Sequence, residues 1–427
     1  MKAIVDCNNF YCSCERLFLP AFDREPVVVL SNNDGCIISR SDEAKKLGIE
    51  MAGPYFLARP LIEKHHVRAF SSNYNLYGDL SWRVMETLRL LFGKKNVEVY
   101  SVDEAFLDLS AVPKENLLAT AREIKQTVEQ WTGIKVSIGV APTKVLAKLA
   151  NRLSKKEKEK TGCVMVLETE EITCEALRKT PVGDIWGVGY QYAQKLKELW
   201  CIYDALQLRN VSEEFAKTHL GGVVGARLIR ELKGIPSKEM EEELVKKKMI
   251  ATTRMFGSPV GNINDIKEAV ATYTSRAAEK LRRQHGAARI ISVFVVSKEE
   301  NHNVTFNRGV TQSRQVVLNT ATSFTNELIK PAMSLVESLF ENGKLYKKAG
   351  VMLSGIVPDD AIQGNLFLSE NKNCERKLME MIDNVNFSQR DDILKFASSG
   401  TTRNWKMRQE LRSPRYTTRW TELPQVR

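Results

Sequence analysis

The chain has 427 residues, which is more than one hydrophobic core usually organises, so we expect two to four domains. Its 63 Lys and Arg residues outnumber its 52 Asp and Glu residues, a formal net charge of +11 that favours a polyanionic partner, with nucleic acid ahead of an acidic membrane surface. No apolar run is long enough to cross a bilayer, no signal peptide is visible and the eight cysteines suggest no disulfide framework, so we expect a cytoplasmic protein with no membrane partner.

The first part of the chain alternates between predicted strands and a predicted helix. Residues 2–6 and 26–31 are short apolar runs that are typical of strands. Residues 39–48, SRSDEAKKLG, have a polar start, a basic end and a closing glycine, which together predict a helix ended by Gly48.

Two adjacent acids lie inside an apolar segment, residues 97–109 (VEVYSVDEAFLDL), which predicts a hairpin with Asp103 and Glu104 at its bend. Asp6 also ends an apolar strand, so neighbouring strands could bring three acids to one edge of a sheet. Such a cluster needs a cation, and oxygen ligands without His or Cys favour Mg²⁺, which usually shares its remaining positions with substrate phosphates. The cluster predicts phosphoryl transfer. The alternative is that the two acids only cap a hairpin turn.

Two helices and one strand follow the hairpin. The apolar residues from Leu117 to Trp131 keep helical spacing, residues 135–141 (KVSIGVA) are typical of a strand, and a second helix starts near Thr143. The order β-β-α-β-α predicts an antiparallel or mixed sheet with helices on one face. This α+β layout is called ferredoxin-like or palm-like.

Basic residues and a glycine-rich turn are candidates for phosphate binding. Ser39 and Lys45 flank the start of the first helix, and the second helix carries Lys144, Lys148, Arg152 and Lys155. Between helical stretches, Gly187 and Gly189 form a tight turn whose bare backbone can approach a phosphate, the helix-hairpin-helix pattern of nonspecific DNA binding. The alternative for the basic residues is a set of solvated helix faces.

A series of short motifs runs along the chain in a fixed order: DCNNFYCSCE at 6–15, VVVLSNNDGCIISRSDEAKKLGI at 27–49, FSSNY at 70–74, YSVDEAF at 100–106, GVAPTKVLAKLAN at 139–151, DIWGVG at 184–189, AAEKLR at 277–282, KKAGV at 347–351 and SPRYTTRW at 413–420. On these motifs, the chain resembles the Y-family translesion DNA polymerases over nearly its whole length, and more narrowly their UmuC-like members.

The resemblance implies a two-metal active site. Asp6, Asp103 and Glu104 would be ligands of two Mg²⁺ ions with help from the backbone carbonyl of Cys7, and Asp103 and Glu104 would be the catalytic acids. Asn8 stands where many family members carry another acid, a departure that UmuC-like chains share.

The resemblance also implies a nucleotide pocket. Tyr11 matches the steric gate whose ring would collide with a ribose 2′-hydroxyl, and Phe10 would pack beside it. Ser39, Lys45 and Lys155 match positions near the triphosphate, although Asp42 stands where many relatives have Tyr.

The implied domains are a palm (1–22 and 79–166), fingers (23–78), a helix-hairpin-helix thumb (167–237), a little finger made of a sheet and helices (238–354) and a C-terminal tail (355–427). Gly187 and Gly189 in the thumb and Arg254 in the little finger would contact DNA.

The implied function is DNA-directed DNA polymerase activity for error-prone translesion synthesis in the SOS response, without proofreading. The implied partners are primer-template DNA, dNTPs, a UmuD-like dimer and a recombinase filament. Two alternatives stay open: a noncatalytic DNA-binding scaffold recruited to the sliding clamp, and a palm-fold nucleotide cyclase.

The tail contains a short clamp-binding pattern. Gln363, Leu366 and Phe367 have the spacing of the Q-x-x-L-F peptide by which bacterial polymerases dock on the sliding clamp. The alternative is that Leu366 and Phe367 pack the tail against the little finger.

Overall fold

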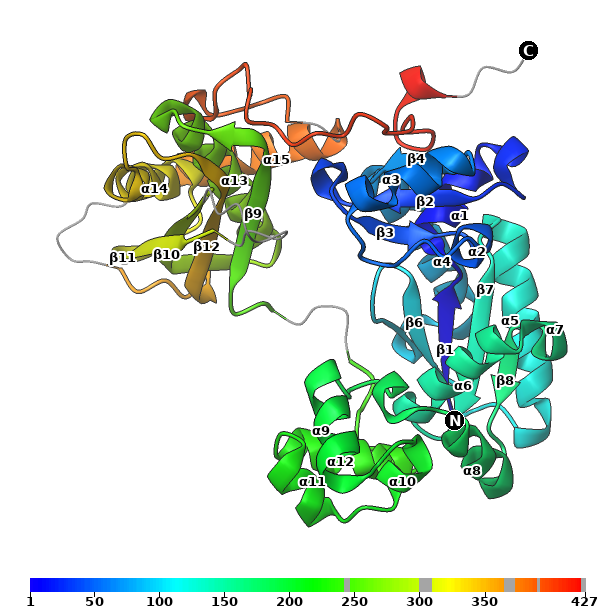
Figure 1. The fold of residues 1–427 in the computed structure, drawn as a ribbon. Helices are drawn as coiled ribbons and strands as arrows, with labels where there is room; N and C mark the ends of the chain where they lie inside the picture. Colours follow the sequence, from blue (N-terminus) through cyan, green and yellow to red (C-terminus); the bar gives the residue numbers. More distant parts are fainter. Residues whose placement is uncertain (242–245, 299–308, 365–372, 390–391, 424–427) are drawn as a thin grey trace.

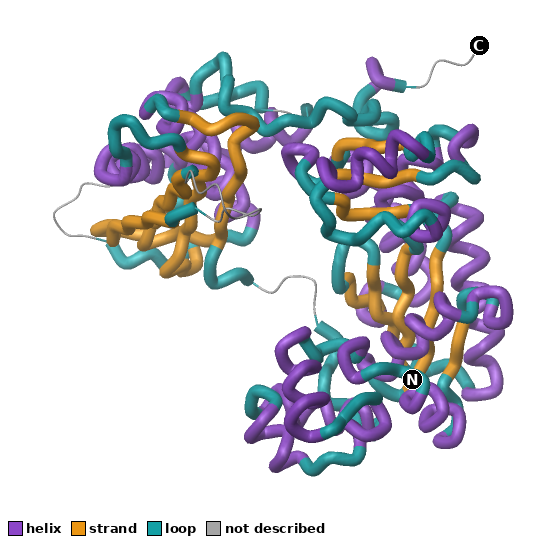
Figure 2. Tube along the Cα trace, viewed as in Figure 1, coloured by secondary structure: helices purple, strands orange, loops and turns teal. Residues whose placement is uncertain are grey.

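The computed structural model of the chain describes residues 1–241, 246–298, 309–364, 373–389 and 392–423. These residues form three sheets and a group of helices without a sheet, followed by a C-terminal tail (Figures 1 and 2). None of the helices in these ranges is both long and apolar enough to cross a membrane. The predicted α+β, multidomain architecture is confirmed.

The first sheet has five strands in the order β5-β6-β1-β7-β8, and its central strand β1 is antiparallel to both neighbours. The strands are β1 (Lys2–Cys7), β5 (Val97–Val99), β6 (Glu104–Asp108), β7 (Val136–Ala141) and β8 (Val164–Val166). The predicted hairpin is confirmed, because β5 and β6 pair antiparallel, with Asp103 at the bend and Glu104 at the start of β6.

Helices cover both faces of this sheet, so the expectation of helices on one face is wrong. Ala3 and Val5 of β1 share a core with α4 and α5, whereas Ile4 packs with α6. Side chains alternate between the faces of a strand, so a run buried at every position belongs to a strand covered on both sides. The helices are α1 (Phe10–Leu17), α4 (Tyr74–Phe92), α5 (Leu117–Thr132), α6 (Lys144–Lys156) and α7 (Lys158–Thr161).

A second sheet has three strands in the order β3-β2-β4, and its strands come between β1 and β5 in the sequence. Its elements are β2 (Val27–Leu30), β3 (Ile37–Arg40), β4 (Arg68–Ser71), α2 (Asp42–Lys46) and α3 (Tyr55–Lys64). The helix predicted over 39–48 is shorter than expected, since pairing with β2 draws Ser39 and Arg40 into β3. Ser41 then caps α2 by accepting a hydrogen bond from the amide of Ala44 at 3.3 Å.

The rest of the chain forms a helical group and a four-stranded sheet. The helices are α8 (Glu170–Arg178), α9 (Tyr190–Trp200), α10 (Ala205–Arg209), α11 (Glu213–His219) and α12 (Val223–Leu232). The antiparallel sheet, in the order β11-β10-β12-β9, shares one core with α13 and α14. Its elements are β9 (Ile250–Val260), α13 (Ile263–Arg283), β10 (Gly286–Ser297), β11 (Thr311–Thr322), α14 (Thr325–Leu339) and β12 (Tyr346–Pro358).

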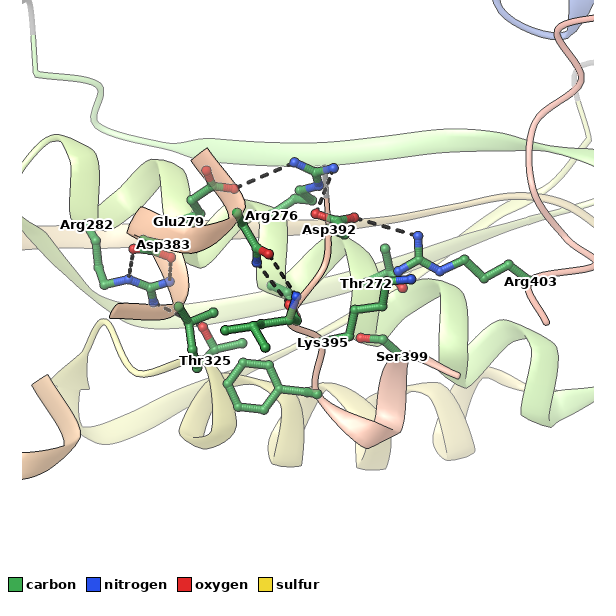
Figure 3. A pocket seen from close by; sticks show the side chains of 15 residues that line it. Thr272, Arg276, Glu279, Arg282, Thr325, Asp383, Asp392, Lys395, Ser399 and Arg403 are labelled. Atoms are coloured by element: carbon green, nitrogen blue, oxygen red, sulfur yellow. Dashed lines mark hydrogen bonds and ion pairs between the residues drawn. The ribbon is translucent and has the colours of Figure 1, made fainter. Parts of the chain in front are cut away.

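The C-terminal tail follows this last sheet with α15 (Asn373–Ser388), which lies against α13, and then crosses to the three-stranded sheet (Figure 1). Ion pairs hold its first part on α13, as Figure 3 shows. The guanidinium of Arg282 donates to both carboxylate oxygens of Asp383 at 2.7 Å. The carboxylate of Asp392 lies 2.9 Å from Arg276 and 3.6 Å from Arg403. Beyond Arg403, the tail reaches the edge strand β4.

Helix α6 lies directly on strand β7 at Gly139. A Cβ atom at this position would be 2.2 Å from the carbonyl oxygen of Ala147 and 2.3 Å from the amide nitrogen of Asn151. Both neighbours are helix backbone, which cannot rotate aside as a side chain can. The close approach of α6 therefore requires glycine at this position.

We predict that Gly139→Ala lowers the free energy of unfolding by about 1–3 kcal/mol, because the added methyl group pushes α6 off the sheet. Gly78→Ala is the matched control: Gly78 lies inside α4 with nothing within 4 Å of an added Cβ, so the change should be neutral or stabilising. Denaturant unfolding of the two variants measures the difference. Equal stability would contradict the close-packing argument.

Candidate active site

The ends of two neighbouring strands place Asp6 and Glu104 side by side. The two residues are register partners in the antiparallel pairing of β1 with β6. The amide of Cys7 donates a hydrogen bond to the carbonyl oxygen of Asp103 at 2.8 Å, which ties the bend of the hairpin to the end of β1. The three predicted acids therefore come together at one edge of the sheet.

Helix α6 supplies the groups that bind two of these carboxylates. Lys155 Nζ lies 2.6 Å from Asp6 Oδ1, and Asn151 Nδ2 donates to Asp6 Oδ2 at 3.1 Å. Lys148 Nζ bridges both oxygens of Glu104 at 3.1 and 3.0 Å. The positive charge beside the acids thus comes from two lysines of one helix.

The third carboxylate turns toward its own bend, where Asp103 Oδ1 accepts a hydrogen bond from the hydroxyl of Ser101 at 2.6 Å. With each acid engaged separately, the described residues include no three acidic, histidine or cysteine side chains grouped to hold a metal ion.

Burial raises the pKa of Glu104, Lys148 opposes that rise, and Asp6 and Asp103 add to it. The three negative charges are close enough to repel one another.

The side chains at the site offer oxygen atoms as metal ligands, which suits a hard cation. These ligand atoms are carboxylate oxygens. The thiol of Cys7 is buried, and its pKa is raised by burial and by the neighbouring acids. Asn8 Oδ1 and Asn151 Oδ1 are also buried, and neither has a hydrogen-bond partner among the described residues. Oxygen ligands of this kind suit Mg²⁺.

Some basic residues of α6 pair with the acids of the site, and others form ion pairs elsewhere in the fold. Lys144 is buried, with Nζ 2.5 Å from Glu98 and 2.6 Å from the carbonyl oxygen of Glu239, so its interpretation as a phosphate contact is wrong. Arg152 pairs with Asp184 at 2.5 Å. Asn151 was missed by the sequence reasoning, although positions 148, 151 and 155 lie on one helix face and Lys148 and Lys155 were already candidates.

Tyr11 lies on α1 with its ring in an aromatic cluster. It stacks on Tyr77 at a centroid distance of 4.6 Å and meets Tyr74 edge-on at 6.1 Å. The ring of Phe10 is buried and lies 5.7 Å from that of Tyr11. Burial, with contributions from Tyr74 and Asp103, raises the pKa of Tyr11 to about 12. The aromatic ring is therefore held close to the acidic end of the site.

Ser39 and Lys45 meet at Asn9, the residue before α1. Lys45 Nζ lies 2.5 Å from Asn9 Oδ1 and 3.0 Å from Asp42, which also contacts Lys158 at 2.7 Å. Ser39 is buried, and its hydroxyl accepts a 3.4 Å hydrogen bond from the amide of Cys12. Burial works to raise the pKa of Asp42, but hydrogen bonds from Lys158, Asn9 and Lys45 lower it overall.

The predicted hairpin glycines follow a short 3-10 turn (Val182–Asp184) and precede α9. Gly187 has a φ of +103°, which glycine adopts without strain, and Gly189 is exposed with open space around it. Trp186 directly precedes Gly187. Its ring lies 5.5 Å from the ring of Tyr100, in the hairpin that carries the acids, and 5.0 Å from Lys148 Nζ. This aromatic contact links the turn to the acidic hairpin.

The other predicted contacts lie away from the acids. Arg254 is exposed on the edge strand β9 and pairs in register with Ala349 of β12. Gln363 is exposed. Leu366 and Phe367 lie outside the described residues.

Comparisons with known proteins identify the family. Residues 5–152 match the impB/mucB/samB family, residues 247–366 match its C-terminal domain, and residues 376–426 match a domain of unknown function, DUF4113. The chain is 41% identical to the protein UmuC of Salmonella typhimurium strain LT2, with 100% of both chains covered. It is 34% identical to the protein MucB of Escherichia coli over 99% of each chain.

Solved structures share the fold. A Y-family DNA polymerase chimera of Dbh and Dpo4 matches with a TM-score of 0.66 and 22% identity, covering 84% of this chain and 99% of that one. An insertion ternary complex of Dbh DNA polymerase matches with a TM-score of 0.55 and 22% identity, with the same coverage. These solved structures show that the chain has the fold of Y-family DNA polymerases. The family models and the full-length UmuC relative show that the chain belongs to the impB/mucB/samB family.

Proposed function

We propose that the chain extends a primer on damaged template DNA by two-metal nucleotidyl transfer, without proofreading. The observation that carries the proposal is the pairing of Asp6 with Glu104 on adjacent strands, next to Asp103. A noncatalytic scaffold does not need three acids at one sheet edge. A nucleotide cyclase does not need the glycine turn or the four-stranded sheet that follows it.

In this proposal, the palm is residues 1–22 and 79–166, the fingers 23–78, the thumb 167–237, the little finger 238–354 and the tail 355–427. The five-stranded sheet would carry the acids, and the three-stranded sheet would cover the nucleotide. The helical group and the four-stranded sheet would hold the duplex.

Asp6, Asp103, Glu104 and the carbonyl of Cys7 would hold two Mg²⁺ ions. The chemistry that Mg²⁺ would supply when bound is a lowered pKa of the primer 3′-hydroxyl and neutralisation of charge on the triphosphate. Lys155 and Lys148, which pair with Asp6 and Glu104 in this structure, would be free to bind phosphate once cations take over the carboxylates. Ser39 and Lys45, beside Asn9, would position the triphosphate on the other side.

The DNA contacts would be electrostatic and independent of sequence. The open backbone at Gly187 and Gly189 would approach one phosphate. Arg254 would bind another, and its charge acts on Lys280: burial lowers the pKa of Lys280, and the charges of Arg254, Lys247 and Arg276 lower it further. Neighbouring positive charges on β9 and α13 suit a phosphate backbone.

We predict that Asp103→Asn and Glu104→Ala each reduce the rate of nucleotide incorporation by at least about 100-fold, because charge stabilisation at the reacting phosphate is lost. Primer-template affinity should change by no more than about twofold, since it depends on many phosphate contacts. Asp108→Asn is the matched control: Asp108 lies on the same strand, where it pairs with Lys2 at 2.7 Å. Primer extension and DNA binding separate the effects. Extension at the wild-type rate by either active-site variant would rule out the assignment.

We predict that Tyr11→Ala raises ribonucleotide incorporation relative to deoxynucleotide incorporation by about tenfold or more, since removal of the ring opens space for the 2′-hydroxyl. Tyr11→Phe, which keeps the ring, should discriminate like the wild type. Single-nucleotide insertion with matched rNTP and dNTP measures the ratio. An unchanged ratio in Tyr11→Ala would show that another residue excludes ribose.

We propose the sliding clamp as a partner through Gln363, Leu366 and Phe367, and a UmuD-like dimer and a recombinase filament as further partners. The clamp would raise the local concentration of polymerase at the primer end without new DNA contacts.

We predict that Leu366→Ala combined with Phe367→Ala abolishes stimulation by a loaded clamp and leaves extension of a bare short primer within about twofold of wild type. Leu378→Ala is the matched control, because Leu378 is an exposed apolar residue on α15 of the same tail. Full stimulation of the double variant would place the clamp contact elsewhere.

A further inference from the structure

The C-terminal tail contacts α1 and α4, the helices that carry Tyr11 and Tyr77 of the proposed nucleotide pocket. After Trp405, which is buried beside Tyr273 of α13, the tail runs along β4. There, the amide of Ser71 donates to the carbonyl oxygen of Leu411 at 3.0 Å, and the amide of Leu411 donates to the Ser71 hydroxyl at 2.9 Å. The residues that follow contact the start of α4 and the end of α1.

Asn73 anchors the tail at the start of α4. Its side-chain Nδ2 donates to the carbonyl oxygen and the hydroxyl of Ser413 at 3.1 and 3.0 Å, and to the carbonyl oxygen of Pro414 at 3.1 Å. Its Oδ1 accepts from the amide of Leu76 and so caps α4. One buried side chain therefore both begins α4 and holds the tail.

Tyr416 anchors the tail at the end of α1. Its ring stacks on Phe18 with centroids 4.6 Å apart and planes 15° apart, and it belongs to the same core as Tyr77. Burial, together with the charge of Glu15, raises the pKa of Tyr416. The buried ring of Tyr416 therefore packs against the end of α1.

The two anchored helices carry the aromatic cluster around Tyr11. Tyr77 of α4 stacks on Tyr11, and its hydroxyl donates to Glu15 Oε1 of α1 at 2.6 Å. Glu15 is fully buried, and burial raises its pKa to about 7, opposed by the hydroxyl groups of Tyr77 and Ser413. The tail thus contacts the start of α4 through Asn73 and the end of α1 through Phe18, and these two helices carry the stacked rings of Tyr77 and Tyr11.

We infer that residues 413–416 position the sugar-discriminating ring of Tyr11 by holding α1 and α4 together behind it. The inference rests on the proposed role of Tyr11. Ser413, Pro414 and Tyr416 would be positioning residues, because they reach the nucleotide only through other side chains. Part of the region that matches DUF4113 would then belong to the polymerase pocket.

The test compares the ratio of dNTP to rNTP insertion efficiency among tail variants. Tyr416→Ala should lower the ratio by roughly tenfold, because small displacements of a positioning group have large kinetic effects. Tyr416→Phe keeps the stacked ring and should restore the wild-type ratio. Trp420→Ala is the control, since Trp420 is a tail aromatic with 90% of its surface exposed.

Asn73→Asp provides a second route that keeps the cap of α4. Aspartate keeps the acceptor that caps α4 but cannot donate to Ser413 and Pro414, so the tail should be released and the ratio should fall as in Tyr416→Ala. In a Tyr11→Ala background, neither change should lower the ratio further, because no ring is left to position. Thermal unfolding reports any loss of fold separately.

The outcomes distinguish the two proposals. If Tyr11→Ala admits ribonucleotides while folded Tyr416→Ala and Asn73→Asp discriminate like the wild type, the tail has no positioning role and the gate assignment stands. If the tail variants lower the ratio equally in the Tyr11→Ala background, the tail acts by another route and the inference is wrong. If Tyr11→Ala leaves the ratio unchanged, the gate assignment and the inference both fall.

Discussion

The geometry of the candidate active site depends on the close contact between α6 and β7 at Gly139. Because the helix backbone rests on the sheet there, Asn151 and Lys155 reach Asp6 on the neighbouring strand, and Lys148 reaches Glu104 one strand further. A wider helix-to-sheet spacing would lift these side chains away from the acids. The sheet edge would then carry three carboxylates without compensating charge, which is costly in a partly buried site.

The lysines explain how the acids are tolerated before substrates arrive. Burial and mutual repulsion raise the pKa of Glu104, and Lys148 offsets part of that rise. A cation bound by the carboxylates would replace the same charge and release the lysines toward phosphate. In the proposed function, the same side chains would stabilise the substrate-free fold and contribute to nucleotide binding.

The C-terminal tail connects parts of the fold that are distant in the sequence. Ion pairs fasten it to α13, and hydrogen bonds and stacking fasten it to β4, α4 and α1 (Figures 1 and 3). Contacts between residues as far apart as Phe18 and Tyr416 require closure of nearly the whole chain, and this loss of entropy must be balanced by the buried contacts at both ends. The tail is thus a structural part of the fold.

The sequence by itself determined the strands around Asp6 and Asp103, the helices at 117–131 and after Thr143, and the family, because hydrophobic periodicity and ordered motifs are local signals. Only the tertiary structure decided which partners the polar side chains have. Lys144 and Lys155 lie on one helix and look alike in the sequence, yet one is buried against Glu98 and the other binds Asp6. Likewise, no local pattern predicts that Asn73 holds Ser413. Such contacts depend on how separate elements pack, and packing is set by shape complementarity across the whole chain, which neighbouring residues in the sequence do not encode.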